Sequence, residues 1–187
     1  DERSWKSDVP VLFLGEWCCT YDRKSQWSVL DSIMVPPYGW SEGQRDKDFK
    51  YIEDLCEKLL RELVDALNKY HKTNHSLRYW RIMIGSWLHR FVAISFNRWM
   101  TIQSAVDKFK LKGTVIFKLA EEKLIPYDYT SFAHLYRTDI WNHAIYGKIL
   151  QDYTSVECEY VQVKAFSGEQ DISFTQVPVR TFKDHVR

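Results

Sequence analysis

Short apolar runs and long amphipathic stretches alternate along this chain. Residues 9–15, 29–35 and 114–119 are short runs rich in apolar residues, and each is bounded by Gly or Pro. Residues 157–166 alternate polar and apolar side chains instead. These lengths and boundaries predict four β-strands.

The helical pattern is clearest between the second and third of these strands. Over residues 46–71, apolar residues recur at steps of three and four, so one stripe faces the core and the charges face solvent. A second helix is predicted to start at Asn74 or Ser76 and to run through Leu88, with a possible break at Gly85 and Ser86. The helical pattern then continues to about residue 110. A third helix is predicted over residues 130–151.

The order of these elements predicts an α/β fold, with a sheet covered by helices. In such sheets, ligands bind beyond the carboxyl ends of the strands. The run VLFLGEWCC would deliver Glu16 and Trp17 to that edge, beside the loop after Leu119. Glu16 could act there as a general base or bind a sugar hydroxyl. In the alternative interpretation, it caps a helix or pairs with Arg23.

The segment HSLRYWR, which starts at His75, holds the densest group of candidate binding residues. Arg78 and Arg81 are three positions apart, so they share a helix face, and two guanidinium groups together suit a phosphate or a carboxylate. His75 lies about one turn before Arg78. In the alternative interpretation, Tyr79 and Trp80 belong to the core and the arginines pair with acids on the first long helix.

The segment TDIWNHAIYG, which starts at Thr138, is a second candidate. Asp139 and His143 are four positions apart on a predicted helix and could pair, with the carboxylate fixing the imidazole tautomer. Asn142 could recognise a hydroxyl or an amide. The alternative is the amino-terminal turn of a helix that carries a capped histidine.

The composition is that of a globular protein, with 187 residues, 45% hydrophobic residues and 27% charged residues. Aromatic residues reach 16% and include eight Trp, which predicts that some of them line a pocket or an interface. The net charge of +1 gives no indication of nucleic-acid binding. We expect one domain over residues 1–166, followed by an edge segment or linker over residues 167–187.

No signal peptide is visible at the start of the sequence. Residues 82–99 form the most apolar stretch, but His89, Arg90 and Arg98 make it too charged to cross a bilayer, so a buried helix is predicted.

The four cysteines form no CxxC pair, and this pattern is typical of cysteines that remain reduced thiols. A cytoplasmic location is expected, including the inner face of the membrane. The first residue is not Met, which suggests a fragment.

Several common site motifs are absent from the sequence. His71 and His75 are four positions apart, as metal ligands can be, but no third ligand follows at a recognised spacing, so no metal is expected. There is no dinucleotide-binding or P-loop glycine motif and no nucleophile elbow, and no cofactor is expected. Cys18 or Cys19 could be a nucleophile, although small buried thiols are the commoner case.

Four segments together resemble a known family. They are LFLGEWCCTYDR, VPPYGW, LNKYHKTNHSLRYWRIMIGSWL and DIWNHAIYGKI. They resemble the amino-terminal region of a family of bacterial transferases whose genes lie among those for surface polysaccharide assembly. The resemblance runs from about Val11 to Leu150, and the length of the Trp-rich segments makes it specific.

This resemblance implies a glycosyltransferase-like or sugar-phosphate transferase that takes a nucleotide-activated sugar as donor and a glycan as acceptor. It also implies a Rossmann-like α/β sheet covered by long helices, as in one half of a two-domain glycosyltransferase. A second domain beyond this chain would hold most of the donor, so the chain alone is expected to be inactive. The implied partners are the two substrates and that carboxyl-terminal domain.

The positions that match the family are the candidate site residues. Glu16 or His143 would act as a base toward an acceptor hydroxyl, and Asp139 is the third catalytic candidate. Arg78 and Arg81 would hold a phosphate or a sugar carboxylate. The other substrate-binding candidates are Gly15, Trp17, His75, Trp80, Trp141 and Asn142.

The alternative function is a non-catalytic module that docks onto the assembly machinery through the exposed face of its long helices. The two functions differ in where the tryptophans lie. A transferase needs Trp17, Trp80 or Trp141 open to a cleft beside Glu16, where an indole can stack on a sugar. A docking module would bury them and expose an apolar patch elsewhere.

Overall fold

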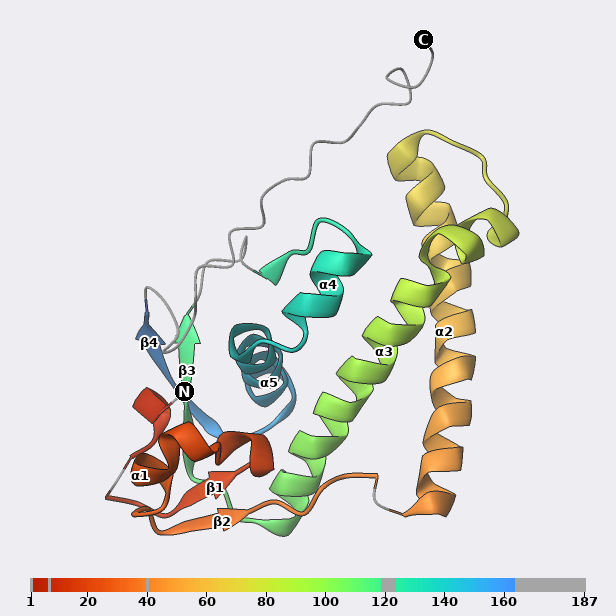
Figure 1. Cartoon of the computed structure of the whole chain (residues 1–187). Helices are drawn as coiled ribbons and strands as arrows, with labels where there is room; N and C mark the ends of the chain where they lie inside the picture. The colour runs from red at the N-terminus through yellow and green to blue at the C-terminus, as the bar shows by residue number, and fades with distance from the viewer. Residues whose placement is uncertain (1, 7, 40, 119–123, 164–187) are drawn as a thin grey trace.

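Two long helices, α2 and α3, lie side by side, with shorter helices and two small sheets next to α3 (Figure 1). The computed structural model describes residues 2–6, 8–39, 41–118 and 124–163. The elements in chain order are η1 (Glu2–Ser4), β1 (Val11–Phe13), η2 (Glu16–Cys18), η3 (Tyr21–Arg23), α1 (Lys24–Trp27), β2 (Ser32–Met34), α2 (Glu42–His71), α3 (Leu77–Lys108), β3 (Gly113–Lys118), α4 (Tyr129–Leu135), α5 (Asp139–Tyr153) and β4 (Glu157–Gln162).

The helices α2 and α3 form a hairpin because their apolar faces bury each other. Leu60 of α2 is buried together with Trp80 and Leu88 of α3. Ser76 begins α3, since its hydroxyl accepts a hydrogen bond from the Tyr79 backbone N–H at 3.3 Å. The apolar stripe of the first long helix and one of the two predicted caps of the second are therefore confirmed.

The side chain of Asn68 holds the turn between these two helices. Its Oδ1 atom accepts hydrogen bonds from the His75 backbone N–H at 2.9 Å, the Thr73 hydroxyl at 3.1 Å and the Trp80 indole N–H at 3.0 Å. Its Nδ2 group donates to the His75 carbonyl at 2.9 Å. One amide thus ties the last turn of α2 to the first turn of α3.

A second face of α3 packs against α5, so α3 lies between α2 and α5 (Figure 1). Ile102 of α3 is buried with Tyr146, Ile149 and Leu150 of α5. Gly147 lets α5 approach β3 closely, because a Cβ atom there would lie 2.9 Å from a methyl group of Ile116. The core is therefore built around one central helix.

The single helix predicted over residues 130–151 is in fact two helices, α4 and α5. Asp128 starts α4 through a reciprocal pair of hydrogen bonds with Ser131, of 2.7 and 2.9 Å. Thr138 starts α5, since its hydroxyl accepts from the Trp141 backbone N–H at 3.3 Å. The prediction of one continuous helix was wrong. The alternative interpretation of TDIWNHAIYG, which placed the amino-terminal turn of a helix there, fits the start of α5.

The predicted Rossmann-like sheet was also wrong. The described strands form two separate parallel pairs, β1 with β2 and β3 with β4. A doubly wound sheet needs helices that connect its strands and cover its faces. Between β2 and β3, however, the chain places two helices that bury each other instead. The described structure is mostly helical, with two short sheets at one side.

Some predictions fall outside the described residues. These are the last residues of the fourth predicted strand, the loop directly after Leu119, and the segment 167–187 with the domain boundary before it.

Among the helices that the structure describes, none is long and apolar enough to cross a bilayer.

We predict that Asn68→Ala loosens the hairpin turn. The change leaves the buried Trp80 indole N–H and two further donors without their acceptor, so the free energy of unfolding should fall by about 2–4 kcal/mol. Asn74→Ala is the matched control, because Asn74 is exposed in the same turn, and it should change stability by less than about 0.5 kcal/mol. Urea unfolding measures both, and equal midpoints would contradict the role of Asn68.

Candidate functional site

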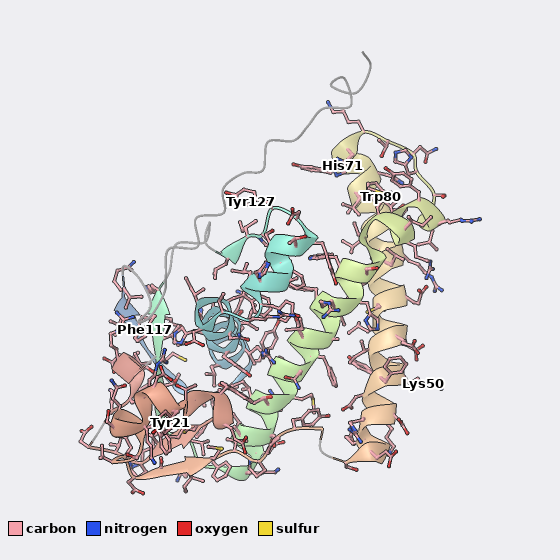
Figure 2. The ribbon with its side chains drawn as sticks, in the orientation of Figure 1. Tyr21, Lys50, His71, Trp80, Phe117 and Tyr127 are labelled. Atoms are coloured by element: carbon pink, nitrogen blue, oxygen red, sulfur yellow. The ribbon has the colours of Figure 1, made fainter. Side chains whose placement is uncertain are left out.

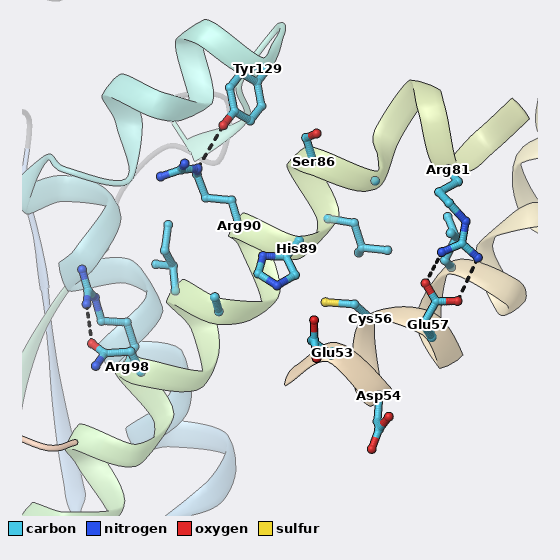
Figure 3. Close-up of a pocket in the computed structure, with 16 residues that line it drawn as sticks. Glu53, Asp54, Cys56, Glu57, Arg81, Ser86, His89, Arg90, Arg98 and Tyr129 are labelled. Atoms are coloured by element: carbon cyan, nitrogen blue, oxygen red, sulfur yellow. Dashed lines mark hydrogen bonds and ion pairs between the residues drawn. The ribbon is translucent and has the colours of Figure 1, made fainter. Parts of the chain in front are cut away.

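An open groove of about 1190 Å³ runs along α3, between α2 on one side and α4 on the other (Figure 3). It is the candidate functional site, because it brings arginines of α3 to the same cavity as acids of α2. Its polar lining residues are Glu53, Asp54, Cys56, Glu57, Arg81, Ser86, His89, Arg90, Asn97, Arg98 and Tyr129.

One end of the groove is neutralised by an ion pair between the two long helices. The guanidinium of Arg81 donates to both carboxylate oxygens of Glu57, and the Nη2–Oε2 distance is 2.9 Å. These hydrogen bonds lower the pKa of the Glu57 carboxyl. Arg81 therefore contacts an acid on the first long helix, as the alternative interpretation of HSLRYWR predicted, while it also lines the groove.

Arg90, further along α3, is held by phenol oxygens. Its Nε donates to the Tyr129 hydroxyl at 2.9 Å and its Nη1 donates to the Tyr136 hydroxyl at 3.3 Å. Hydrogen bonding from Arg137, with a further contribution from Arg90, lowers the pKa of Tyr136. The side chain of Arg90 thus extends from α3 toward α4 across the rim of the groove (Figure 3).

Arg98 is held by amide oxygens. Its Nε donates to Asn142 Oδ1 at 2.8 Å, and its Nη1 donates to Asn97 Oδ1 at 2.7 Å. The Nδ2 group of Asn142 donates to the carbonyls of Tyr136 and Thr138 at 3.0 and 2.8 Å. Those two contacts require an NH₂ group on that side, so Oδ1 of Asn142 must face Arg98. Asn142 therefore positions the guanidinium from α5.

The charges of Arg90 and Arg98 are not matched by carboxylates. In the described part of the chain neither forms an ion pair, and all four acceptors of their printed contacts are neutral. A guanidinium has five N–H donors, and these contacts use two on each arginine. Both arginines can therefore donate further hydrogen bonds to an anion.

His89, Glu53 and Cys56 provide groups that could move a proton or react. In Figure 3, His89 points from α3 into the space above α2, where the side chains of Glu53 and Cys56 lie. Imidazole and carboxylate are the commonest general acids and bases in enzymes. Burial raises the pKa of the Cys56 thiol, which disfavours the reactive thiolate. His89 and Glu53 are therefore the better candidates for acid–base chemistry.

The segment Gly15–Trp17 lies outside this groove. Glu16 is exposed at the start of η2, and the Trp17 ring folds back over Gly15, where a Cβ atom would lie 2.2 Å from the indole. A side chain at position 15 would displace the exposed Trp17 ring. Burial raises the pKa of the neighbouring Cys18 thiol, which makes it a poor nucleophile.

The candidate residues of the segment TDIWNHAIYG lie on α5, near η2 and η3. Asp139 forms an ion pair of 3.6 Å with Arg23, which joins the start of α5 to η3. His143 is largely buried, its ring stacks on Phe117 at 4.9 Å, and its Nε2 atom accepts a hydrogen bond from the Phe117 backbone N–H at 2.8 Å. Burial lowers the pKa of His143 to about 4. Its imidazole is thus a neutral acceptor for β3.

The structure does not bring the predicted tryptophans together. Trp80 is buried between α2 and α3, and Trp141 is 4% exposed in a separate core cluster. Trp17 is 55% exposed and belongs to neither of these clusters. His75 stacks on Tyr79 in the turn at the end of the hairpin, at a ring distance of 3.9 Å.

Of the predicted site residues, Arg81 lines the groove and Asn142 holds a groove arginine; Arg78 is exposed outside it. The sequence interpretation did not identify Arg90, Arg98, His89 or Tyr129 as site residues. A signal for them exists, because residues 66–106 contain no Asp or Glu and six Lys or Arg. Arginines in such a run have no acid nearby in sequence.

Among the described residues, no three His, Cys, Asp or Glu side chains gather into a possible metal site.

Comparison with protein families gives a match over nearly the whole chain. The model of the LIC12162 family transferase matches residues 1–184 of this chain. Comparison with curated proteins and with solved structures finds no significant match. The family model covers nearly the whole chain and includes every residue of the groove.

We predict that His143 makes the fold sensitive to acid. The unfolded chain takes up a proton on this histidine near pH 6.5, but the folded chain does so only near pH 4. Stability is therefore unaffected above pH 6.5 and falls by up to about 3 kcal/mol as the pH drops to 4, where the loss stops.

His143→Gln is the matched variant, because its side-chain oxygen can still accept from the Phe117 N–H. Urea unfolding at several pH values should show that the variant lacks this dependence. A histidine resonance of His143 that titrates near pH 6.5 in NMR spectra would contradict the prediction.

Proposed function

This chain belongs to the LIC12162 family of transferases, and we propose that it is the amino-terminal part of an enzyme that transfers a glycosyl or sugar-phosphate group from a nucleotide-activated donor. The acceptor is a glycan of the bacterial cell surface. Two features support this proposal: the resemblance of its Trp-rich segments to transferases of surface polysaccharide assembly, and the arginine-lined groove. The proposal does not depend on a Rossmann-like sheet.

The observation that carries the proposal is the pair of arginines held by neutral oxygens. Arg90 and Arg98 are positioned by hydroxyl and amide acceptors, which fix each guanidinium without cancelling its charge. Guanidinium groups in such a setting bind phosphate through short charge-assisted hydrogen bonds. A nucleotide-activated donor carries that phosphate next to the bond that breaks.

The spacing of the two arginines suits a long ligand. They are eight residues apart on α3, so their backbones are separated by about 12 Å along the helix axis. A nucleotide sugar is long enough to contact both, while a single phosphate contacts one. The groove, at about 1190 Å³, has room for such a molecule.

The groups in the groove can serve both sides of the reaction. In glycosyl transfer, the acceptor hydroxyl oxygen forms a bond to the anomeric carbon of the donor sugar. The bond from that carbon to the donor phosphate breaks, and its electron pair leaves with the nucleotide. Arg90 and Arg98 stabilise the growing negative charge on the departing phosphate. His89 or Glu53 takes the proton of the acceptor hydroxyl.

The catalytic candidates from the sequence have different places in this proposal. His143 is unsuited as a base, because its Nε2 atom is occupied and its pKa is about 4. Glu16 and Asp139 stay as candidate contacts for the acceptor. Both lie outside the groove: Glu16 is in η2, and Asp139 joins α5 to η3 through its ion pair with Arg23.

A second candidate function is a docking module of the assembly machinery. Trp80 and Trp141 are buried, while Val29 and Ile33 near the β1–β2 sheet are 78% and 54% exposed. In a bacterial strain that needs this protein for its surface glycan, Val29→Asp with Ile33→Asp would abolish the glycan if docking is the function. Glycan loss on changing the groove arginines, with the surface variant still active, would favour the transferase.

We predict that both groove arginines contribute to phosphate binding. Arg90→Gln and Arg98→Gln should each weaken the binding of a nucleoside diphosphate about ten-fold or more, because each removes a charge-assisted contact. Arg45→Gln is the control, since Arg45 is exposed on α2 outside the groove, and it should bind as the unchanged protein does. Isothermal titration calorimetry with UDP measures all four proteins.

A charge change that keeps both arginines makes a sharper test. Asn97→Asp places a carboxylate on Arg98 without altering the size of the side chain, so it should weaken UDP binding while the fold stays intact. Unchanged UDP affinity in Asn97→Asp and in both arginine variants would show that the groove does not bind the donor phosphate.

A further inference from the structure

We infer that the end of the α2–α3 hairpin docks onto an anionic lipid surface. This hairpin tip comprises residues 68–83: the last turn of α2, the connecting turn and the first two turns of α3 (Figure 1). The inference concerns where the protein attaches and does not rest on the proposed function.

The hairpin tip is a rigid, convex end of the molecule. His71 and Trp80, labelled in Figure 2, mark it at the end of the long helices away from Lys50. The hydrogen bonds of Asn68 fix the turn, and Trp80 packs between the helices beneath it. A convex end of fixed shape suits contact with a flat surface.

Apolar side chains are exposed on the hairpin tip. Ile82 and Met83 of α3 are 73% and 60% exposed, and Tyr79 shares their face of the helix because it lies three and four positions before them. Tyr70, at the end of α2, is also strongly exposed. Aliphatic side chains beside tyrosines are typical of segments that lie in a membrane interface.

The charges of the hairpin tip are all positive. Lys69, Lys72 and Arg78 are exposed, and in the described part of the chain none of them forms an ion pair. The tip lies in the acid-free run 66–106, so no carboxylate of its own offsets these cations. Anionic phospholipid surfaces attract such clusters of basic residues.

The combination of cations and exposed aliphatic side chains favours a lipid bilayer over other occupants. Nucleic acid would match the cations and leave Ile82 and Met83 exposed to water. A second copy of this chain in a two-fold contact would bring Lys69, Lys72 and Arg78 against their own counterparts, which repel. A bilayer with anionic headgroups accepts the aliphatic groups and the cations together.

The first test is co-sedimentation of the full chain with vesicles. We expect binding to vesicles of equal parts phosphatidylcholine and phosphatidylglycerol, little binding to pure phosphatidylcholine, and weaker binding as salt is added. Each basic residue near such a surface strengthens binding about five-fold, so the double variant Lys69→Glu with Lys72→Glu should bind roughly 25-fold more weakly or worse.

A matched control separates the hairpin tip from general charge. Lys47→Glu with Lys50→Glu makes the same charge change, at the same spacing, near the other end of α2 (Figure 2), and it should bind nearly as the unchanged protein does. Ile82→Ser with Met83→Ser should weaken vesicle binding while the thermal unfolding midpoint stays unchanged, because both side chains are exposed.

Three results would overturn the inference. The unchanged chain fails to bind anionic vesicles, or the two lysine double variants bind alike, or neutral and anionic vesicles bind equally well. Failure on vesicles together with binding of polyglutamate that depends on Lys69 and Lys72 would identify an acidic protein as the occupant instead.

Discussion

The whole structure depends on the packing of α3, which buries different faces against two neighbouring helices. One face of this 32-residue helix buries Trp80 and Leu88 against α2, and another packs Ile102 and Val106 against α5. Burial of these apolar groups is the main stabilising term for both contacts. Because two faces are committed to packing, Arg81, Arg90 and Arg98 lie along the remaining strip, which borders the groove.

This packing also decides how the arginines on that strip are satisfied. The acid-free run 66–106 supplies no carboxylate from its own helix, and the acids of α2 lie across the groove, where Glu57 meets Arg81. Arg90 and Arg98 therefore obtain their partners as phenol and amide oxygens from α4, α5, the turn between them and Asn97 of α3 itself. The break at Thr138 contributes directly, since Asn142 binds the Tyr136 and Thr138 carbonyls and presents its oxygen to Arg98.

Local signals in the sequence predicted the long helices well but did not point to the groove. The stripe along residues 46–71 and the cap at Ser76 are local features, and both are confirmed. The sheet was mispredicted because short apolar runs do not reveal whether neighbouring helices cover strands or bury each other. Trp80 and Trp141 looked like ligand-binding aromatics, yet they fill the core, since a tryptophan carries no local sign of its partner. The groove depends on contacts more than 35 residues apart, such as Arg90 with Tyr129, which no local pattern encodes.

The central claim is that Arg90 and Arg98 together form an anion-binding wall on α3. The most direct measurement is NMR observation of the arginine Nε–Hε groups during titration with a nucleotide sugar. The resonances of Arg90 and Arg98 should shift together and saturate at one ligand concentration, while those of Arg45 and Arg61 stay in place. If no arginine responds, or if all exposed arginines shift in proportion to added ligand, the groove is not the donor site.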